Sequence, residues 1–227
     1  MKRPTITENE TIESLGPYFL IQRKAGHRLT SDTVALAVFA AKSISEKDKV
    51  IDLGTATGAL LLLLAWKTGA EKLIGVEIDK EAALTAGKNI EANGLEARAG
   101  VLNADYRDLP AMYPEGAFSA IVSNPPYTKA GTGRVSPKAE RAIARSEVKG
   151  GLAELVRVSK HLAGKSGKIF YVFPVTRLSE MLIESQKCGL NARRLRFVHT
   201  GKGAEPRFFL VELGIDGGME MEEPLFL

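Results

Sequence analysis

Cysteine is nearly absent from this chain, because Cys188 is the only one among 227 residues. An intrachain disulfide and a cysteine cage for a metal are therefore excluded. Histidine is also scarce: His27, His161 and His199 stand far apart, with no acidic residue at a metal-ligand spacing. We therefore expect no metal cofactor, and the single thiol fits a protein of the reducing cytoplasm.

Long hydrophobic runs are missing as well. The longest, Ala59–Trp66, has eight residues, whereas a helix needs about 20 to cross a bilayer. The N-terminus lacks the apolar core of a signal peptide, so we expect no membrane association. Charge is only mildly unbalanced, with a formal net charge of +4. An anionic partner is therefore allowed but not required.

Segments typical of strands and helices alternate from about Lys49 onward, and no linker or repeat divides the chain. The expected strands are Lys49–Leu53, Lys72–Ile78, Ala97–Asn103, Phe118–Asn124 and Lys168–Phe173. The expected helices are Ala59–Lys67, Lys80–Asn93, Gly151–Leu162 and Arg177–Lys187. Apolar strands in βαβα order predict an α/β fold, a mostly parallel sheet with helices on both faces.

Both ends of the chain add to this core. Near the C-terminus, strands are expected at Arg193–Thr200 and Pro206–Ile215, and the link between them is too short for a parallel crossover. They predict an antiparallel hairpin at the sheet edge, which gives seven strands in all. Near the N-terminus, "YFLIQRKAGHR" indicates a short strand or hairpin, and "TSDTVALAVFAAK" a helix capped by Thr30, Ser31 or Asp32.

The segment "VIDLGTATGALLLLLAW" indicates a strand, a glycine turn and a helix. Gly54 and Gly58 let the backbone bend sharply and approach a ligand at the start of the helix. Glu77 ends the next strand, where a carboxylate accepts the hydroxyls of a ribose. Together they favour nucleoside binding, although a tight turn beside a solvated acid fits too. The spacing departs from G-x-G-x-x-G, so a pyrophosphate is disfavoured.

The segment "IVSNPPY" ends an expected core strand with two prolines and a tyrosine. Because ligands bind beyond the carboxyl ends of strands, Asn124 would face the reactive end of a bound nucleoside. The Asn124 amide oxygen and the Pro125 carbonyl, stiffened by Pro126, offer two acceptors for one NH2 group. Tyr127 offers a face for stacking a base. The pattern favours methylation of an amine, and the plain alternative is a rigid turn.

A basic segment follows, Thr128–Lys149, with six basic residues against two acidic ones. The basic residues are candidate phosphate contacts for RNA: Lys129, Arg134, Lys138, Arg141, Arg145 and Lys149. The last four follow helical spacing, so they share one face. A solvated helix face is the alternative. A second cluster, "RRLRF" with Arg193, Arg194 and Arg196, is interpreted as the solvated side of an edge strand.

The glycine turn resembles the cofactor turn of class I S-adenosylmethionine-dependent methyltransferases. The resemblance implies a Rossmann-like fold and S-adenosyl-L-methionine as cofactor. It implies that Asp52, Gly54, Thr55 and Gly58 line the methionine half, that Glu77 and Ile78 hold the ribose end, and that Asp105 and Tyr106 contact the adenine. Ser31 is a candidate for the methionine tail, and Asn124 for the reactive end. Ala56 replaces the middle glycine of the family, and we expect its φ to be negative.

Nearly the whole chain resembles the bacterial tRNA1(Val) (adenine-37-N6)-methyltransferase family, in "TSDTVALAVFA", "DLGTATG", "GVEID", "NADYRD", "SNPPY", "ERAIARSE", "GKIFYVFP" and "EPRFFLVELGIDGG". The resemblance implies transfer of a methyl group to adenine N6 in tRNA, catalysed by Asn124, Pro125, Pro126 and Tyr127. It implies one methyltransferase domain over residues 1–227, with a hairpin and first helix at 1–45 and a catalytic core at 46–227, and no obligate protein partner.

Two alternatives remain open. A protein-glutamine methyltransferase uses the same amine-directed motif, but its relatives carry a sizeable N-terminal helical domain, and only about thirty residues precede Thr30 here. The other alternative is a non-catalytic RNA-binding module. Restriction-type DNA adenine methyltransferases carry a separate target-recognition domain, which we do not expect here.

Overall fold

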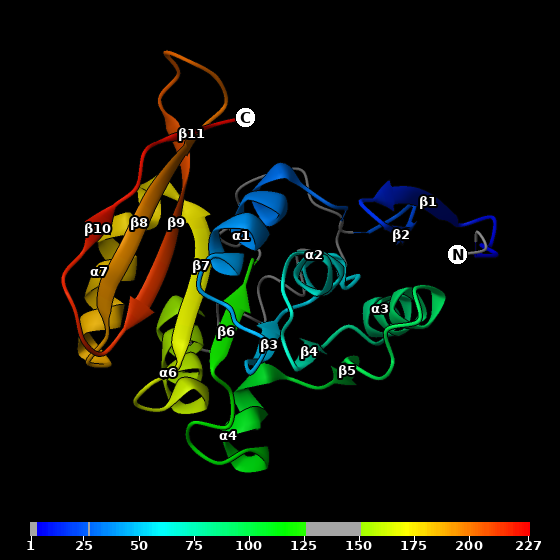
Figure 1. Ribbon diagram of the computed structural model, residues 1–227, viewed down its shortest axis with the longest axis horizontal. Coiled ribbons are helices and arrows are strands. Elements are labelled where there is room, and N and C mark those ends of the chain that lie inside the picture. The colour runs from blue at the N-terminus through cyan, green and yellow to red at the C-terminus, as the bar shows by residue number, and fades with distance from the viewer. Residues whose placement is uncertain (1–3, 27, 126–150) are drawn as a thin grey trace.

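The central sheet contains all seven strands that the sequence predicts. The computed structural model describes residues 4–26, 28–125 and 151–227. The strands are β3 Lys49–Leu53, β4 Lys72–Glu77, β5 Ala99–Asn103, β6 Ala120–Ser123, β7 Lys168–Pro174, β8 Asn191–His199 and β9 Pro206–Gly214. They lie in the order β8-β9-β7-β6-β3-β4-β5, and only β9 runs antiparallel to its neighbours β7 and β8. The α/β prediction is confirmed (Figure 1).

Helices cover both faces of this sheet, because successive side chains of a buried strand point to opposite faces. Val50 packs in the core under α1 Ser31–Ala41, α2 Ala59–Lys67 and α3 Lys80–Ala92. Ile51 packs in the core under α4 Leu109–Met112, α6 Gly151–Ala163 and α7 Leu178–Lys187. Two short 3-10 helices, η1 Tyr106–Asp108 and η2 Val175–Arg177, precede α4 and α7. Each helix in the described ranges is too short or too polar to span a bilayer.

The end of the sheet differs from the prediction. Two strands of two residues each, β10 Glu220–Met221 and β11 Leu225–Phe226, pair parallel with β8, so the β8–β9 hairpin does not form a bare edge. Arg194 on β8 is not solvated as expected. Its side chain is 13% exposed and contacts Glu212 and Glu222, each at 2.6 Å. The interpretation of this segment as a solvated basic face is therefore wrong at Arg194.

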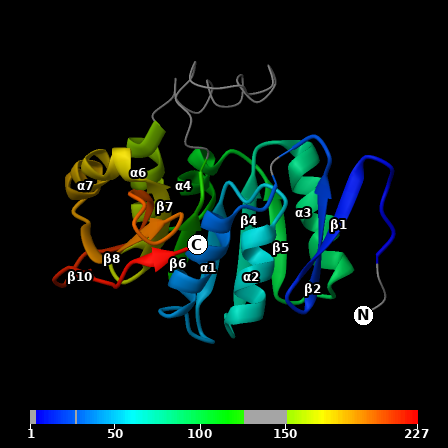
Figure 2. The same cartoon turned by 90° about the horizontal axis from the view of Figure 1, so that it is seen from above.

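The N-terminal hairpin forms a separate two-stranded sheet, β1 Glu10–Leu15 and β2 Tyr18–Arg23, as the sequence indicates. Figure 2 shows it beside α3. Two buried asparagines attach it there, Asn89 in α3 and Asn93 directly after the helix. Asn89 Oδ1 accepts from Ile21 N at 2.7 Å, and Asn89 Nδ2 donates to Ile21 O at 2.8 Å. Asn93 repeats this pair of bonds one turn later with Phe19 N and O, at 2.9 and 2.8 Å.

Candidate active site

The carboxyl ends of four neighbouring parallel strands bring the predicted site residues to one edge of the sheet. Asn124 follows β6, Gly54 follows β3, Glu77 ends β4 and Asp105 lies just beyond β5. In the order β6-β3-β4-β5, the glycine turn therefore lies between Asn124 on one side and the two acids on the other. This edge is where open α/β sheets bind ligands. The structure thus brings together residues that are up to 70 positions apart in the chain.

The glycine turn is tied to β4 by its own backbone. Gly54 N and Thr55 N both donate to Val76 O, at 2.9 and 3.0 Å. Gly54 and Gly58 have φ angles of +82° and +77°, which a side chain would disfavour. A Cβ added at Gly54 would meet no atom within 4 Å. The space beside the turn is therefore open enough for a ligand to approach the backbone.

Ala56 departs from the prediction, because its φ is +50°. Among the residues that the structure describes, it is the one non-glycine residue with a positive φ. This conformation costs an alanine about 1–2 kcal/mol. The expected negative φ is therefore wrong, because the turn adopts a left-handed conformation at Ala56. A hydrogen bond from Ala56 N to Glu77 Oε2, at 2.9 Å, holds the residue in place.

Glu77 is a carboxylate whose direction is fixed by two backbone groups. Its Oε2 accepts from Ala56 N, and its Oε1 accepts from Asp79 N at 2.8 Å. Since each carboxylate oxygen has about two lone-pair sites, both oxygens keep one acceptor site each. The side chain is half-buried at the end of β4. This geometry suits the acceptance of two neighbouring hydroxyl groups.

Asp52 and Thr55 are buried polar residues, 1% and 5% exposed. Both carboxylate oxygens of Asp52 and the hydroxyl of Thr55 are without a hydrogen-bond partner in the described chain. Burial raises the pKa of Asp52 to about 7, the nearby Thr55 hydroxyl opposes the rise without reaching hydrogen-bond geometry, and the Glu77 charge adds to it. Buried polar groups are nearly always satisfied in native proteins. These three atoms therefore mark a place for a polar, cationic ligand group.

Asp105 caps the start of η1 after β5, and Tyr106 is the first residue of η1. The Asp105 carboxylate accepts from Arg107 N at 3.0 Å and from Arg107 Nε at 2.8 Å, so its orientation is set by the 3-10 turn and the guanidinium. The half-buried Tyr106 ring packs against the core under α6. Burial, and after it the Asp105 charge, raises the pKa of Tyr106. The contact of both residues with an adenine stays a prediction.

Asn124 is anchored to the first turn of α1. Its Nδ2 donates to Thr33 Oγ1 at 2.7 Å and to Asp32 Oδ2 at 3.4 Å. Thr30, one of the predicted capping residues, occupies the N-cap position of α1. The expected side-chain hydrogen bond of the cap is not formed, so that part of the prediction is wrong. Sequence reasoning missed the contact of Asp32 and Thr33 with Asn124. The available signal was an acidic residue at the start of an otherwise apolar helix.

Ser31 is exposed at the start of the same helix, and Ile78, directly after Glu77, is 60% exposed. Pro125 is half-buried after Asn124. Other predicted site residues lie outside the described ranges: Pro126, Tyr127, Lys129, Arg134, Lys138, Arg141, Arg145 and Lys149.

Residues 30–166 match the model of the methyltransferase small domain family. The chain belongs to this family. Curated relatives include a tRNA1(Val) (adenine(37)-N6)-methyltransferase of Tolumonas auensis, 28% identical over 92% of this chain and 86% of the relative. Another of the same name, from Porphyromonas gingivalis, is 29% identical over 88% of this chain and 80% of the relative.

A solved structure from Agrobacterium tumefaciens, described as a "predicted O-methyltransferase", is 20% identical and covers 86% of each chain, with a TM-score of 0.65. At that identity the likeness shows the fold alone. The family match makes this protein an S-adenosylmethionine-dependent methyltransferase of Rossmann-like fold.

The residues present fit the cofactor of this methyltransferase family. The unpartnered Asp52 carboxylate suits the ammonium of the methionine part. The open space beside Gly54 leaves room for the rest of the methionine part. The oriented Glu77 carboxylate suits the ribose hydroxyls. These assignments stay proposals at the level of single residues. They agree with the order of the strands, because Asn124 then lies on the methionine side of the turn.

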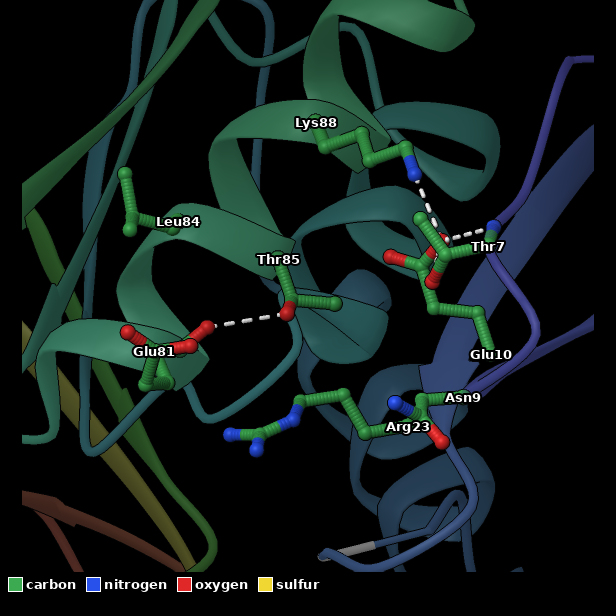
Figure 3. A pocket seen from close by; sticks show the side chains of 8 residues that line it. All are labelled: Thr7, Asn9, Glu10, Arg23, Glu81, Leu84, Thr85 and Lys88. Carbon is green, nitrogen blue, oxygen red and sulfur yellow. Dashed lines mark hydrogen bonds and ion pairs between the residues drawn. The ribbon is translucent and has the colours of Figure 1, made fainter.

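A cavity of about 300 Å³ lies elsewhere, between the N-terminal hairpin and α3 (Figure 3). None of the predicted site residues lines it. Two acidic and two basic side chains contribute to its wall, and one pair, Lys88 with Glu10 at 2.7 Å, is already joined. The wall is therefore balanced in charge, unlike a phosphate site. The lining residues are Thr7, Asn9, Glu10, Arg23, Glu81, Leu84, Thr85 and Lys88.

Proposed function

We propose that this methyltransferase transfers the methyl group of S-adenosylmethionine to the exocyclic N6 amine of an adenine in tRNA, in the anticodon loop. The observation that carries the proposal is the placement of Asn124. Asn124 lies beyond β6, beside the glycine turn. Its amide nitrogen donates to Thr33 and Asp32 at the start of α1, so its amide oxygen is directed away from that helix. An acceptor at this position suits an NH2 group.

Bound S-adenosylmethionine supplies an electrophilic methyl group on a sulfonium. The protein's task is to make a poor nucleophile reactive, because the lone pair of an adenine amine is delocalised into the ring. The Asn124 oxygen and the Pro125 carbonyl accept its two hydrogens and favour the geometry in which the lone pair is free to react. The rest of the rate enhancement comes from holding the amine and the methyl group in the right relative position. The amine needs no prior deprotonation, since its proton becomes acidic only after alkylation.

Two further groups of residues support an RNA substrate in this proposal. Tyr127 follows the catalytic group and offers a ring for stacking the adenine, worth about 1–3 kcal/mol per base. The six basic residues of segment 128–149, which follows this motif in the sequence, offer charges for phosphates. Two relatives at 28–29% identity bear the name of a tRNA1(Val) (adenine(37)-N6)-methyltransferase. By this proposal the target adenine is splayed from its stack to reach the site.

Incubation with methyl-labelled S-adenosylmethionine, bulk tRNA and cell protein tests the proposal. We expect label in the tRNA, recovered as N6-methyladenosine after digestion to nucleosides. Label in protein alone would contradict the proposal and favour a glutamine amide, which the same acceptors would hold. Asn124→Ala is the matched variant: we expect it to lose transfer and to keep tRNA binding. A wild type that binds tRNA without any transfer would favour a binding module instead.

A further inference from the structure

We propose that Asp32 is a positioning residue for methyl transfer, because it fixes which end of the Asn124 amide faces the target amine. The inference rests on the proposed function and deepens it. An asparagine amide has an acceptor end and a donor end of nearly equal size. Only the acceptor end helps to hold an NH2 group. A residue that selects this end therefore contributes to transfer through Asn124.

The contacts of Asn124 show where the selection comes from. Its Nδ2 lies 2.7 Å from Thr33 Oγ1 and 3.4 Å from Asp32 Oδ2. The Thr33 hydroxyl is both a donor and an acceptor, so it would serve either end of the amide. A carboxylate only accepts. Of these two contacts, Asp32 is therefore the one that distinguishes the ends of the amide, although it is the longer contact.

The fold keeps this carboxylate in place. Asp32 is 6% exposed and lies in the first turn of the 11-residue helix α1. The positive end of a helix dipole stabilises an acidic residue in that turn. The side chains come from positions 92 residues apart, so the pair joins the start of α1 to the end of β6. Its burial makes the interaction stronger than it would be in water.

The orientation has a direct chemical consequence. A reversed amide would point two N–H bonds at the hydrogens of the target amine and repel it. With the nitrogen bound to Asp32, the oxygen is the end of the amide that is directed away from α1. Hydrogen bonds in a chain also polarise one another, so the carboxylate makes the Asn124 oxygen a stronger acceptor. Asp32 thus acts through Asn124 without touching the substrate.

An exchange of the two side chains tests the inference. Asn124→Asp alone places two carboxylates at the distance of the present pair, and we expect kcat to fall at least roughly 100-fold, the scale of losing one preorganised group. The double variant Asp32→Asn/Asn124→Asp restores a donor facing an acceptor, with an oxygen still directed at the amine. We expect it to recover at least about tenfold of the lost kcat.

Two single variants serve as controls. Asp32→Asn should lower kcat by roughly tenfold, since either end of each amide then faces the other, while KM for S-adenosylmethionine stays unchanged. Thr33→Val removes the shorter hydrogen bond but keeps the carboxylate, so we expect a smaller loss of kcat than for Asp32→Asn. Thermal unfolding with bound cofactor shows that each variant is folded.

The outcomes separate this inference from the proposed function. If the wild type methylates adenine and the double variant is no more active than Asn124→Asp, Asp32 has only a structural role and the inference is overturned alone. If the wild type methylates a protein amide, the proposed substrate fails, and the same rescue on that amide supports the role of Asp32. Rescue with adenine supports both statements.

Discussion

Ala56 N donates a hydrogen bond to Glu77 Oε2 at 2.9 Å, and it does so from a left-handed backbone conformation. The strained residue of the turn and the acid at the end of the neighbouring strand therefore hold each other. Backbone strain of this kind is retained where the surrounding structure enforces it, commonly at ligand sites. The strained conformation of Ala56 thus orients the Glu77 carboxylate and lowers the stability of the protein.

Ala56→Gly should stabilise the protein. Glycine adopts a positive φ without the steric penalty of a Cβ, and this gain exceeds the added entropy of the unfolded chain, so we expect the free energy of unfolding to rise by about 0.5–1 kcal/mol. Urea denaturation measures it. Ala153→Gly, in the regular helix α6, is the matched control and should lower stability by about 0.5–1 kcal/mol. A loss of stability in both variants would contradict the claim that the backbone of Ala56 is strained.

Glu77→Ala should weaken cofactor binding more than RNA binding. Removal of the carboxylate removes the acceptors proposed for the ribose and frees Ala56 N, so we expect the Kd for S-adenosylmethionine to rise roughly 10–100-fold. Titration calorimetry with the cofactor and with tRNA compares the two effects. Glu81→Ala, in the exposed first turn of α3, should change neither. A larger effect on tRNA than on cofactor would refute the assigned role.

Asp52 should make stability depend on pH. Burial raises its pKa from 3.8 to about 7, so its favourable contribution is complete below pH 3.8 and is lost as pH rises to about 7. Asp52→Asn removes the free-energy cost of the buried negative charge. We expect its gain in free energy of unfolding, without cofactor, to grow between pH 4 and pH 7 and then to level off.

Urea denaturation of both proteins at pH 4.5, 6 and 7.5 measures how this gain in free energy of unfolding changes with pH. The exposed Asp216 offers a control, and Asp216→Asn should show no comparable growth. A gain from Asp52→Asn that stays constant or declines with rising pH would contradict the buried, unpartnered carboxylate.

Asn89 should link the N-terminal hairpin to cofactor affinity. Besides its two bonds to Ile21, its Nδ2 donates to Thr57 O in the glycine turn at 2.9 Å. Asn93 holds the same hairpin, but among the described residues its side-chain hydrogen bonds go to Phe19 and Asn89 O and not to the turn. We expect Asn89→Ala and Asn93→Ala each to cost about 2 kcal/mol or more of stability, while only Asn89→Ala weakens S-adenosylmethionine binding. Equal affinity in the two variants would show that the bond to Thr57 is unimportant.

The order and type of the core elements could be predicted because each is locally encoded. The strand Lys49–Leu53 and the helix Ala59–Lys67 have the predicted bounds. Their apolar runs fix burial, and the intervening glycines fix the turn. The placement of Asn124 and Glu77 at one sheet edge follows from parallel strand order alone. This part of the site depends on topology rather than on packing detail.

Other features depend on tertiary contacts that no local pattern carries. The pairing of Asp32 with Asn124 joins residues 92 positions apart, and a capping role was the local expectation for an acid at a helix start. Arg194 reads as a solvated basic residue until Glu222 of the C-terminal tail is brought beside it. Ala56 keeps a conformation that its own Cβ opposes, because Glu77 holds its N–H.

Mass spectrometry of tRNA nucleosides, from cells with the active protein and from cells carrying only Asn124→Ala, tests the central claim most directly. We predict that N6-methyladenosine is present at an anticodon-loop adenine in the first tRNA pool and is missing at that position in the second. Identical N6-methyladenosine content at every tRNA position in the two pools would contradict the account.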